Sequence, residues 1–267
     1  MKIKDIRASL HTTSITIPLL EGRVDGYGRE EQKHFIYVEV ETDDGIVGSG
    51  LTGHFLAESV IVALERHFLP VVRDMDPRDL EAIHQRVLGK LNPRAMTGTV
   101  SMALAAFDVA LWDIIGKHAG RSVAQLLGNA RQEVPCYVTF GFPQYDRETL
   151  AEAARLHVSN GFKGLKTVVA VDPGGWREDA ARVHAIRDAV GEGIDLMMDA
   201  NYLFSPPEAR MLCRAVEDCN LTWFEEPLHQ NDARQLADLR RDTRIPLAAG
   251  QMEGHRWRLR ELVTHHA

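Results

Sequence analysis

Apolar residues recur with two different periods along the chain, and the period changes near residue 130. In the first half, alternation of apolar and polar positions predicts strands over residues 2–10 and 34–50. The Asp44-Gly45 step inside the second stretch is a hairpin signal. Helical periodicity then predicts helices over residues 57–73, 77–90 and 98–118. Strands followed by helices are typical of an α+β unit.

The second half alternates short apolar runs with helical stretches. The apolar runs predict strands over residues 134–140, 164–169, 194–199, 221–225 and 246–251. The stretches between and after them predict helices over residues 147–159, 176–190, 206–217, 231–240 and 255–264. A strand about every 25–30 residues is the βα repeat of a parallel sheet or barrel. A closed barrel has about eight such units. Because five are present, the sequence predicts either an incomplete barrel or an open sheet.

Composition narrows the class of protein. The 267 residues are 45% apolar and 26% charged, which is enough to bury a core in one large domain or two smaller ones. The net charge of −7 is spread along the chain and indicates neither a nucleic acid nor a membrane as partner. The three cysteines are scattered, without CxxC spacing, and indicate reduced thiols rather than a disulfide framework or a zinc site. We therefore expect a soluble cytoplasmic protein.

Polar side chains stand at the carboxyl ends of the strands predicted in the second half. Alternation places Asp199 with Asn201, and Glu225 with Trp223, on one face of their strands. Glu226 then lies on the opposite face, where we expect it to point outward into a loop salt bridge. Sites of α/β barrels and parallel sheets form at the carboxyl ends of strands. Asp199 and Glu225 are therefore expected to converge.

A cation is needed where these carboxylates meet. Two carboxylates about 4 Å apart repel by roughly 4 kcal/mol at an effective dielectric constant of about 20. Alternation adds Gln251 and Glu253 on one face of the fifth strand, and such an all-oxygen set suits Mg²⁺. Lys166, on the second strand, supplies a charge suited to a substrate carboxylate or to proton transfer. Since an acid at a strand end is often only a helix cap or a solvated residue, the prediction rests on the ordered set.

Four motifs in this order carry a family resemblance. They are L-K-T at 165–167, M-D-A-N at 198–201, W-F-E-E-P at 223–227 and A-A-G-Q at 248–251. The chain resembles, over its whole length, the enolase superfamily in its mandelate racemase and sugar-acid dehydratase branch. Asp199, Glu225 and Gln251 are spaced 26 and 26 residues apart, as this resemblance requires.

The resemblance implies an architecture and a chemistry. It implies an α/β fold with an N-terminal α+β capping domain, residues 1–125, and a (β/α)7β TIM-type barrel domain with the site, of which residues 126–267 supply about five units. It implies Mg²⁺ as cofactor and abstraction of the proton α to a carboxylate, with the metal stabilising the enediolate. Capping loops at about residues 20–30 and 50–55 would close over the substrate, with Arg23 and His54 as candidate contacts beside Asn201.

Two residues depart from the family pattern. The second strand usually carries K-x-K, but here it reads Lys166-Thr167-Val168, and Val168 cannot accept a proton. The third metal ligand is usually an acid, but Gln251 offers a neutral oxygen. Glu253 compensates for this directly or through water, or else it pairs with a nearby arginine, Arg256 or Arg258. Both alternatives are open at this point.

The third departure is length. The His–Asp pair that the family carries on its sixth and seventh strands lies outside this sequence. We therefore expect Lys166 to remain protonated and to bind and polarise the substrate, while a histidine beyond Ala267 takes the proton. We also expect the segment to be part of a longer chain or to be completed by other chains as a homo-oligomer, because an open parallel edge invites aggregation.

Three functions fit these residues. The first is dehydration of a sugar acid to a 2-keto-3-deoxy acid, with a small-molecule carboxylate as substrate. The second is racemisation or epimerisation of a 2-hydroxy acid. The third is an inactive relative that binds a metal or a sugar acid, which Val168 and Gln251 would support.

Overall fold

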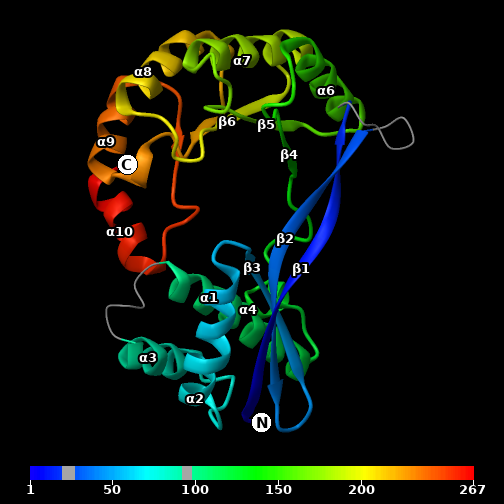
Figure 1. Ribbon diagram of the computed structural model, residues 1–267, viewed down its shortest axis with the longest axis vertical. Helices are drawn as coiled ribbons and strands as arrows, with labels where there is room; N and C mark the ends of the chain where they lie inside the picture. The colour runs from blue at the N-terminus through cyan, green and yellow to red at the C-terminus, as the bar shows by residue number, and fades with distance from the viewer. Residues whose placement is uncertain (20–27, 92–97) are drawn as a thin grey trace. The chain divides into compact units, whose positions relative to one another are not determined.

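The computed structural model describes residues 1–19, 28–91 and 98–267, and the chain packs as two compact units. The first comprises residues 1–15, 31–133 and 254–257. The second comprises residues 16–30, 134–253 and 258–267. Figure 1 gives the element labels used below.

An antiparallel sheet forms one side of the first unit. It contains β1 (Ile3–Pro18), β2 (Gly28–Thr42) and β3 (Val47–Gly53), in that order. The predicted hairpin is confirmed, because β2 and β3 pair antiparallel from Phe35↔Gly53 to Glu41↔Val47 around a turn at Asp44-Gly45. Gly45 has φ +87°, a conformation that favours glycine. β1 continues beyond residue 10, where its predicted strand ended.

The first unit also contains several helices, of which the longest packs on β3. They are α1 (Ala57–Val62), the π-helical turn η1 (Ala63–Phe68), α2 (Leu69–Val72), α3 (Leu80–Leu91), α4 (Thr99–Ala119) and α5 (Val123–Leu126). The predicted helix 57–73 is thus three consecutive segments. Pro70 lacks the N–H that would bond to the preceding turn of the helix. The π-helical turn η1 lies just before Pro70.

α4 is the central helix of the first unit. By length and composition alone it could cross a membrane. It packs against β3, however, so closely that a Cβ on Gly48 or Gly50 would lie 2.1 or 1.9 Å from a backbone oxygen of the helix. Phe107, Leu111 and other side chains of α4 lie in the apolar core of this unit. Its apolar character is therefore that of a core helix.

The second unit is a parallel α/β structure. Its strands are β4 (Tyr137–Phe140), β5 (Gly164–Val168), β6 (Asp195–Asp199), β7 (Trp223–Glu225) and β8 (Leu247–Ala248), which lie side by side in chain order. Its helices are α6 (Arg147–Ser159), α7 (Trp176–Val190), α8 (Pro206–Ala215), α9 (Ala233–Asp242) and α10 (His255–His265), with short 3-10 turns η3 (Glu217–Cys219) and η4 (His229–Asn231). Figure 1 shows these helices along one face of the sheet. The expected α/β fold, with an antiparallel unit before a parallel one, is confirmed.

Candidate functional site

The alternation of β5, β6 and β7 decides which side chains form the site. Leu165, Leu196 and Phe224 are buried in the apolar core of this unit. Lys166, Asp199 and Glu225 each stand an odd number of residues from the core residue of their strand. Their side chains therefore point to the opposite face. Asp199 pairs in register with Val168 of β5 and with Glu225 of β7. Asp199 and Glu225 thus end their strands side by side, and Lys166 lies two residues before the end of β5.

The Lys166 ammonium bridges the two carboxylates. Nζ lies 3.0 Å from Asp199 Oδ2 and donates a hydrogen bond of 2.8 Å to Glu225 Oε1. The three side chains are only 8%, 6% and 16% exposed, respectively. Burial alone would lower the pKa of Lys166, but the hydrogen bonds to Glu225 and Asp199 outweigh it and the pKa is raised. The expected convergence of Asp199 and Glu225 is confirmed, and the Lys166 ammonium lies between the two carboxylates.

Two aromatic side chains, Trp223 and Tyr137, complete the surroundings of Lys166. The sequence alone predicted no role at the site for either of them. Trp223 Nε1 donates a 3.1 Å hydrogen bond to Glu225 Oε2, so both oxygens of this carboxylate are held. The ring of Tyr137 lies edge-on to Trp223, and Nζ of Lys166 is 5.5 Å from its centroid. Tyr137 begins β4, the strand next to β5. The predicted order of the strands could therefore have indicated that Tyr137 lies near Lys166.

The loop after β8 differs from the prediction. β8 ends at Ala248, and Gly250 follows with φ +119°, so strand alternation does not extend to Gln251 and Glu253. The expectation that these two share a strand face is therefore wrong. The Gln251 side chain is exposed. Glu253 pairs with Arg258 at 2.7 Å, which is one of the two alternatives that the sequence left open.

Glu226 corrects a second expectation. It is fully buried rather than solvated, with a left-handed φ of +44° directly after β7. Its Oε1 accepts hydrogen bonds from the backbone N–H of Gly250 at 2.7 Å and of Gln251 at 2.6 Å. Burial raises the pKa of Glu226, against the N–H groups of Gln251 and Gly250, which lower it. Instead of a loop salt bridge, this carboxylate fixes the start of the loop after β8.

The structure defines the positions of the candidate substrate contacts less fully than that of the charged cluster. Asn201 is exposed and left-handed, and its backbone N–H donates to Asp199 Oδ1 at 2.9 Å. His54 is exposed just after β3 and stacks on Phe55 at 4.6 Å between ring centroids. Arg23 lies outside the described residues. Substrate binding by these three residues stays a prediction.

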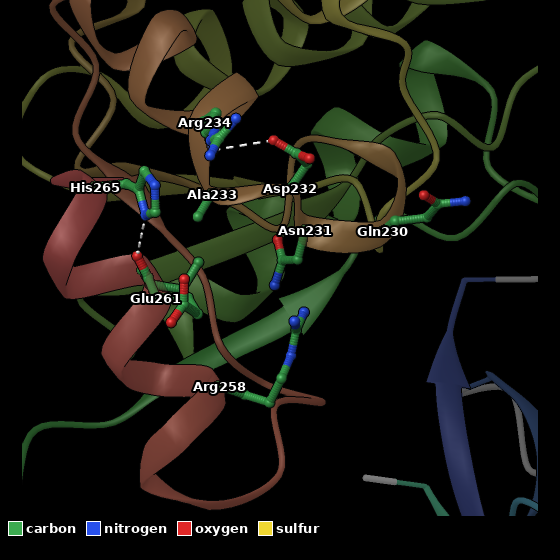
Figure 2. Close-up of a pocket in the computed structure, with 9 residues that line it drawn as sticks. Gln230, Asn231, Asp232, Ala233, Arg234, Arg258, Glu261 and His265 are labelled. Carbon is green, nitrogen blue, oxygen red and sulfur yellow. Dashed lines mark hydrogen bonds between the residues drawn. The ribbon is translucent and has the colours of Figure 1, made fainter. Parts of the chain in front are cut away.

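A pocket of about 450 Å³ in the second unit lies outside this cluster. Figure 2 shows side chains of α10 facing the segment that leads into α9. The residues that line it are Gln230, Asn231, Asp232, Ala233, Arg234, Arg258, Glu261, Leu262 and His265. Arg258 joins this pocket to Glu253, but none of the predicted ligands lines it.

Known protein families match both halves of the chain. Residues 25–128 match the mandelate racemase / muconate lactonizing enzyme N-terminal domain, and residues 148–267 match the enolase C-terminal domain-like family. A curated relative, arabinonate dehydratase of Saccharolobus solfataricus, is 29% identical over 89% of this chain. L-talarate/galactarate dehydratase of Salmonella typhimurium is 30% identical over 94% of it. The chain spans 64% of the length of each of these two relatives.

A solved structure agrees with both family matches. A racemase from Streptomyces coelicolor A3(2) with bound magnesium superposes with a TM-score of 0.85 at 25% identity, covering 99% of this chain and 73% of that one. The superposition covers both the antiparallel sheet of the first unit and the parallel sheet of the second. The chain therefore belongs to the enolase superfamily, in its mandelate racemase and muconate lactonizing enzyme branch.

Proposed function

We propose that this chain carries the metal-binding part of an enzyme that removes the proton α to a carboxylate, and that the reaction is dehydration of a sugar acid. The observation that carries this is the Lys166–Asp199–Glu225 cluster on one face of three adjacent parallel strands, two of which end at its carboxylates. Two named dehydratases of sugar acids among the relatives support it.

The donor chemistry fits Mg²⁺. Asp199 and Glu225 offer carboxylate oxygens, and both already lie within 3.0 Å of a single cationic nitrogen. Hard oxygen donors of this kind are those Mg²⁺ prefers. Asp199 and Glu225 would hold the ion, with Gln251 or Glu253 as the third protein ligand. When bound, Mg²⁺ would supply positive charge beside the carboxylate of the substrate.

The chain's own residues would then bind and orient the substrate. The ammonium of Lys166 would pair with the substrate carboxylate instead of with Asp199 and Glu225. Trp223 and the peptide N–H of Asn201 keep Glu225 and Asp199 in position. Glu226 fixes the backbone of Gly250 and Gln251, on which the third ligand depends. The substrate is a small carboxylate, and a cytoplasmic homo-oligomer remains our expectation.

A sugar-acid library incubated with the protein and Mg²⁺ in D₂O tests the proposal. A dehydratase yields a 2-keto-3-deoxy acid from one or a few substrates. Asp199→Asn should abolish this product, while Asp195→Asn, at the exposed start of the same strand, should not. If Asp199→Asn turns over at the parental rate, the assignment of Asp199 is wrong.

A racemase or epimerase of a 2-hydroxy acid is the second candidate, because a racemase with bound magnesium superposes on this chain. In D₂O it would exchange the α-hydrogen of a substrate without loss of water. An inactive relative that binds a metal or a sugar acid is the third candidate, supported by Val168 and Gln251. It would bind sugar acids without exchanging or dehydrating any.

A further inference from the structure

His184, Asp218 and Cys219 form a cluster outside the strands that carry the candidate site. His184 lies in α7, and the other two lie in the turn η3 that follows α8. Nδ1 of His184 is 3.2 Å from Cys219 Sγ. Asp218 Oδ1 lies 3.7 Å from His184 Nε2 and 4.0 Å from Cys219 Sγ. An imidazole, a thiol and a carboxylate thus meet at one place.

The hydrogen bonds of His184 determine which nitrogen is free to bind. Nε2 lies 2.9 Å from the carbonyl oxygen of Ala215, which can only accept. Nε2 therefore carries the hydrogen, and the lone pair of Nδ1 points toward Cys219 Sγ. Histidines that ligate metals commonly donate their other N–H to a backbone carbonyl in this way. The ring is already oriented as a ligand.

The segment that carries the thiol is held rigidly. The buried Arg187 side chain donates through Nε to the carbonyl oxygen of Cys219 at 2.9 Å and through Nη1 to that of Ile194 at the same distance. Cys219 is 1% exposed, whereas the side chains of His184 and Asp218 are 37% and 79% exposed. An ion can therefore enter from solvent on the side of His184 and Asp218.

The spacing of the sulfur and nitrogen atoms suits metal coordination. Tetrahedral zinc with bonds of about 2.3 Å to sulfur and 2.0–2.1 Å to nitrogen sets these two ligand atoms roughly 3.5 Å apart. The observed 3.2 Å between Nδ1 and Sγ is close to that separation.

We propose that Cys219, His184 and Asp218 bind a thiophilic divalent ion such as Zn²⁺ or Co²⁺, at a site separate from the oxygen ligands Asp199 and Glu225. On binding, the thiol releases its proton to solvent and the sulfur bonds to the metal. The three donors leave a fourth tetrahedral position for water. Sulfur and imidazole select such ions over Mg²⁺, which prefers oxygen.

Co²⁺ titration of the whole chain tests this, because a thiolate bound to Co²⁺ gives a charge-transfer band in the near ultraviolet that oxygen ligands do not give. Excess Mg²⁺ occupies the oxygen ligands during the titration, and Cys136→Ser removes the exposed thiol from the background. We expect the band to form in this background and to vanish in Cys219→Ser. The matched control is Cys213→Ser, a buried cysteine of α8, which should keep the band.

Two further variants keep the test decisive if Cys219→Ser does not fold. His184→Gln and Asp218→Asn change exposed or half-exposed ligands and should each weaken Co²⁺ binding by roughly 10-fold or more. Glu148→Gln, which changes an exposed carboxylate on α6, should bind Co²⁺ as the parent does. The proposal is overturned if the parent gives no band, if the band persists in Cys219→Ser, or if His184→Gln binds Co²⁺ as tightly as the parent.

Discussion

Replacing Lys166 by methionine removes the positive charge between Asp199 and Glu225 and keeps a side chain of similar length. Both carboxylate oxygens lie within 3.0 Å of Nζ. Once the ammonium is gone, two like charges remain at a separation of roughly 5 Å, where they repel by about 3 kcal/mol at an effective dielectric constant of about 20. Removal of one partner from a buried ion pair typically costs about 3–5 kcal/mol. We expect the second unit to lose about 3 kcal/mol of stability when Mg²⁺ is chelated.

Native-state hydrogen exchange measures this loss at the affected strands. The amide of Val169 donates to the carbonyl oxygen of Asp199, and that of Ala200 donates to the carbonyl oxygen of Glu225. Their opening free energies report the stability of β5, β6 and β7 without assuming that both units unfold together. Lys163→Met is the matched control, because Lys163 is exposed just before β5. This control should change the opening free energies by less than about 0.5 kcal/mol.

Added Mg²⁺ should restore the variant more than it stabilises the parent. In Lys166→Met no ammonium competes for the two carboxylates, so the ion binds more tightly. Mg²⁺ at about a hundred times its Kd stabilises by about 2.7 kcal/mol, which nearly offsets the expected loss. Equal stability of parent and variant under chelation, together with equal stabilisation by Mg²⁺, would refute the view that Lys166 neutralises this pair.

Three other variants test separate parts of the structure. In Lys166→Arg the charge is kept, so measurable activity should remain; loss of α-hydrogen exchange with unchanged substrate affinity would instead make Lys166 the base. Burial raises the pKa of Asp179 to about 6 from 3.8. The stability that protonated Asp179 contributes is therefore fully present below about pH 4. It falls by up to about 3 kcal/mol as the pH rises through 6. Urea unfolding at pH 5 and 7.5 should show about 1.4 kcal/mol of this loss in the parent and in the control Asp188→Asn but not in Asp179→Asn; an identical pH dependence in Asp179→Asn would exclude it. Glu226→Leu leaves the N–H groups of Gly250 and Gln251 without their acceptor, at a cost of about 1–3 kcal/mol each; faster hydrogen exchange at these two amides checks this, and unchanged exchange would contradict it.

The sequence predicted the parts of the site that lie on regular strands. Period-two alternation is a property of extended backbone, so it correctly placed Lys166, Asp199 and Glu225 on one face of β5, β6 and β7. The core face of the same strands is apolar, and this fixes the register. The order of strands followed from the βα repeat, because consecutive units lie side by side.

Alternation failed where the backbone leaves the strand. Asn201 and Glu226 have φ values of +45° and +44°, and Gly250 has φ +119°. A residue with left-handed φ changes the direction of the chain and of the side chains after it. Strand alternation therefore no longer predicts which face those side chains occupy. Asparagine and glycine are frequent in this conformation, but glutamate is not, so nothing local predicted the turn at Glu226. Its role depends on backbone groups 24 and 25 residues away in the chain.

The two departures from the family pattern offset each other in charge. Lys166 is the one basic residue in β5, β6 and β7, because Val168 stands where a second lysine is usual. Gln251 stands where a third acid is usual, so one positive and one negative charge are missing together. If Gln251 is the third ligand, it adds no charge; Glu253, if it serves instead, is already neutralised by Arg258. In either case a divalent ion with Lys166, Asp199 and Glu225 leaves a net charge of about one positive unit, the complement of a single substrate carboxylate. A site loaded in this way would therefore keep the electrostatic balance that binds a monoanion, although it would lack the second lysine as a base.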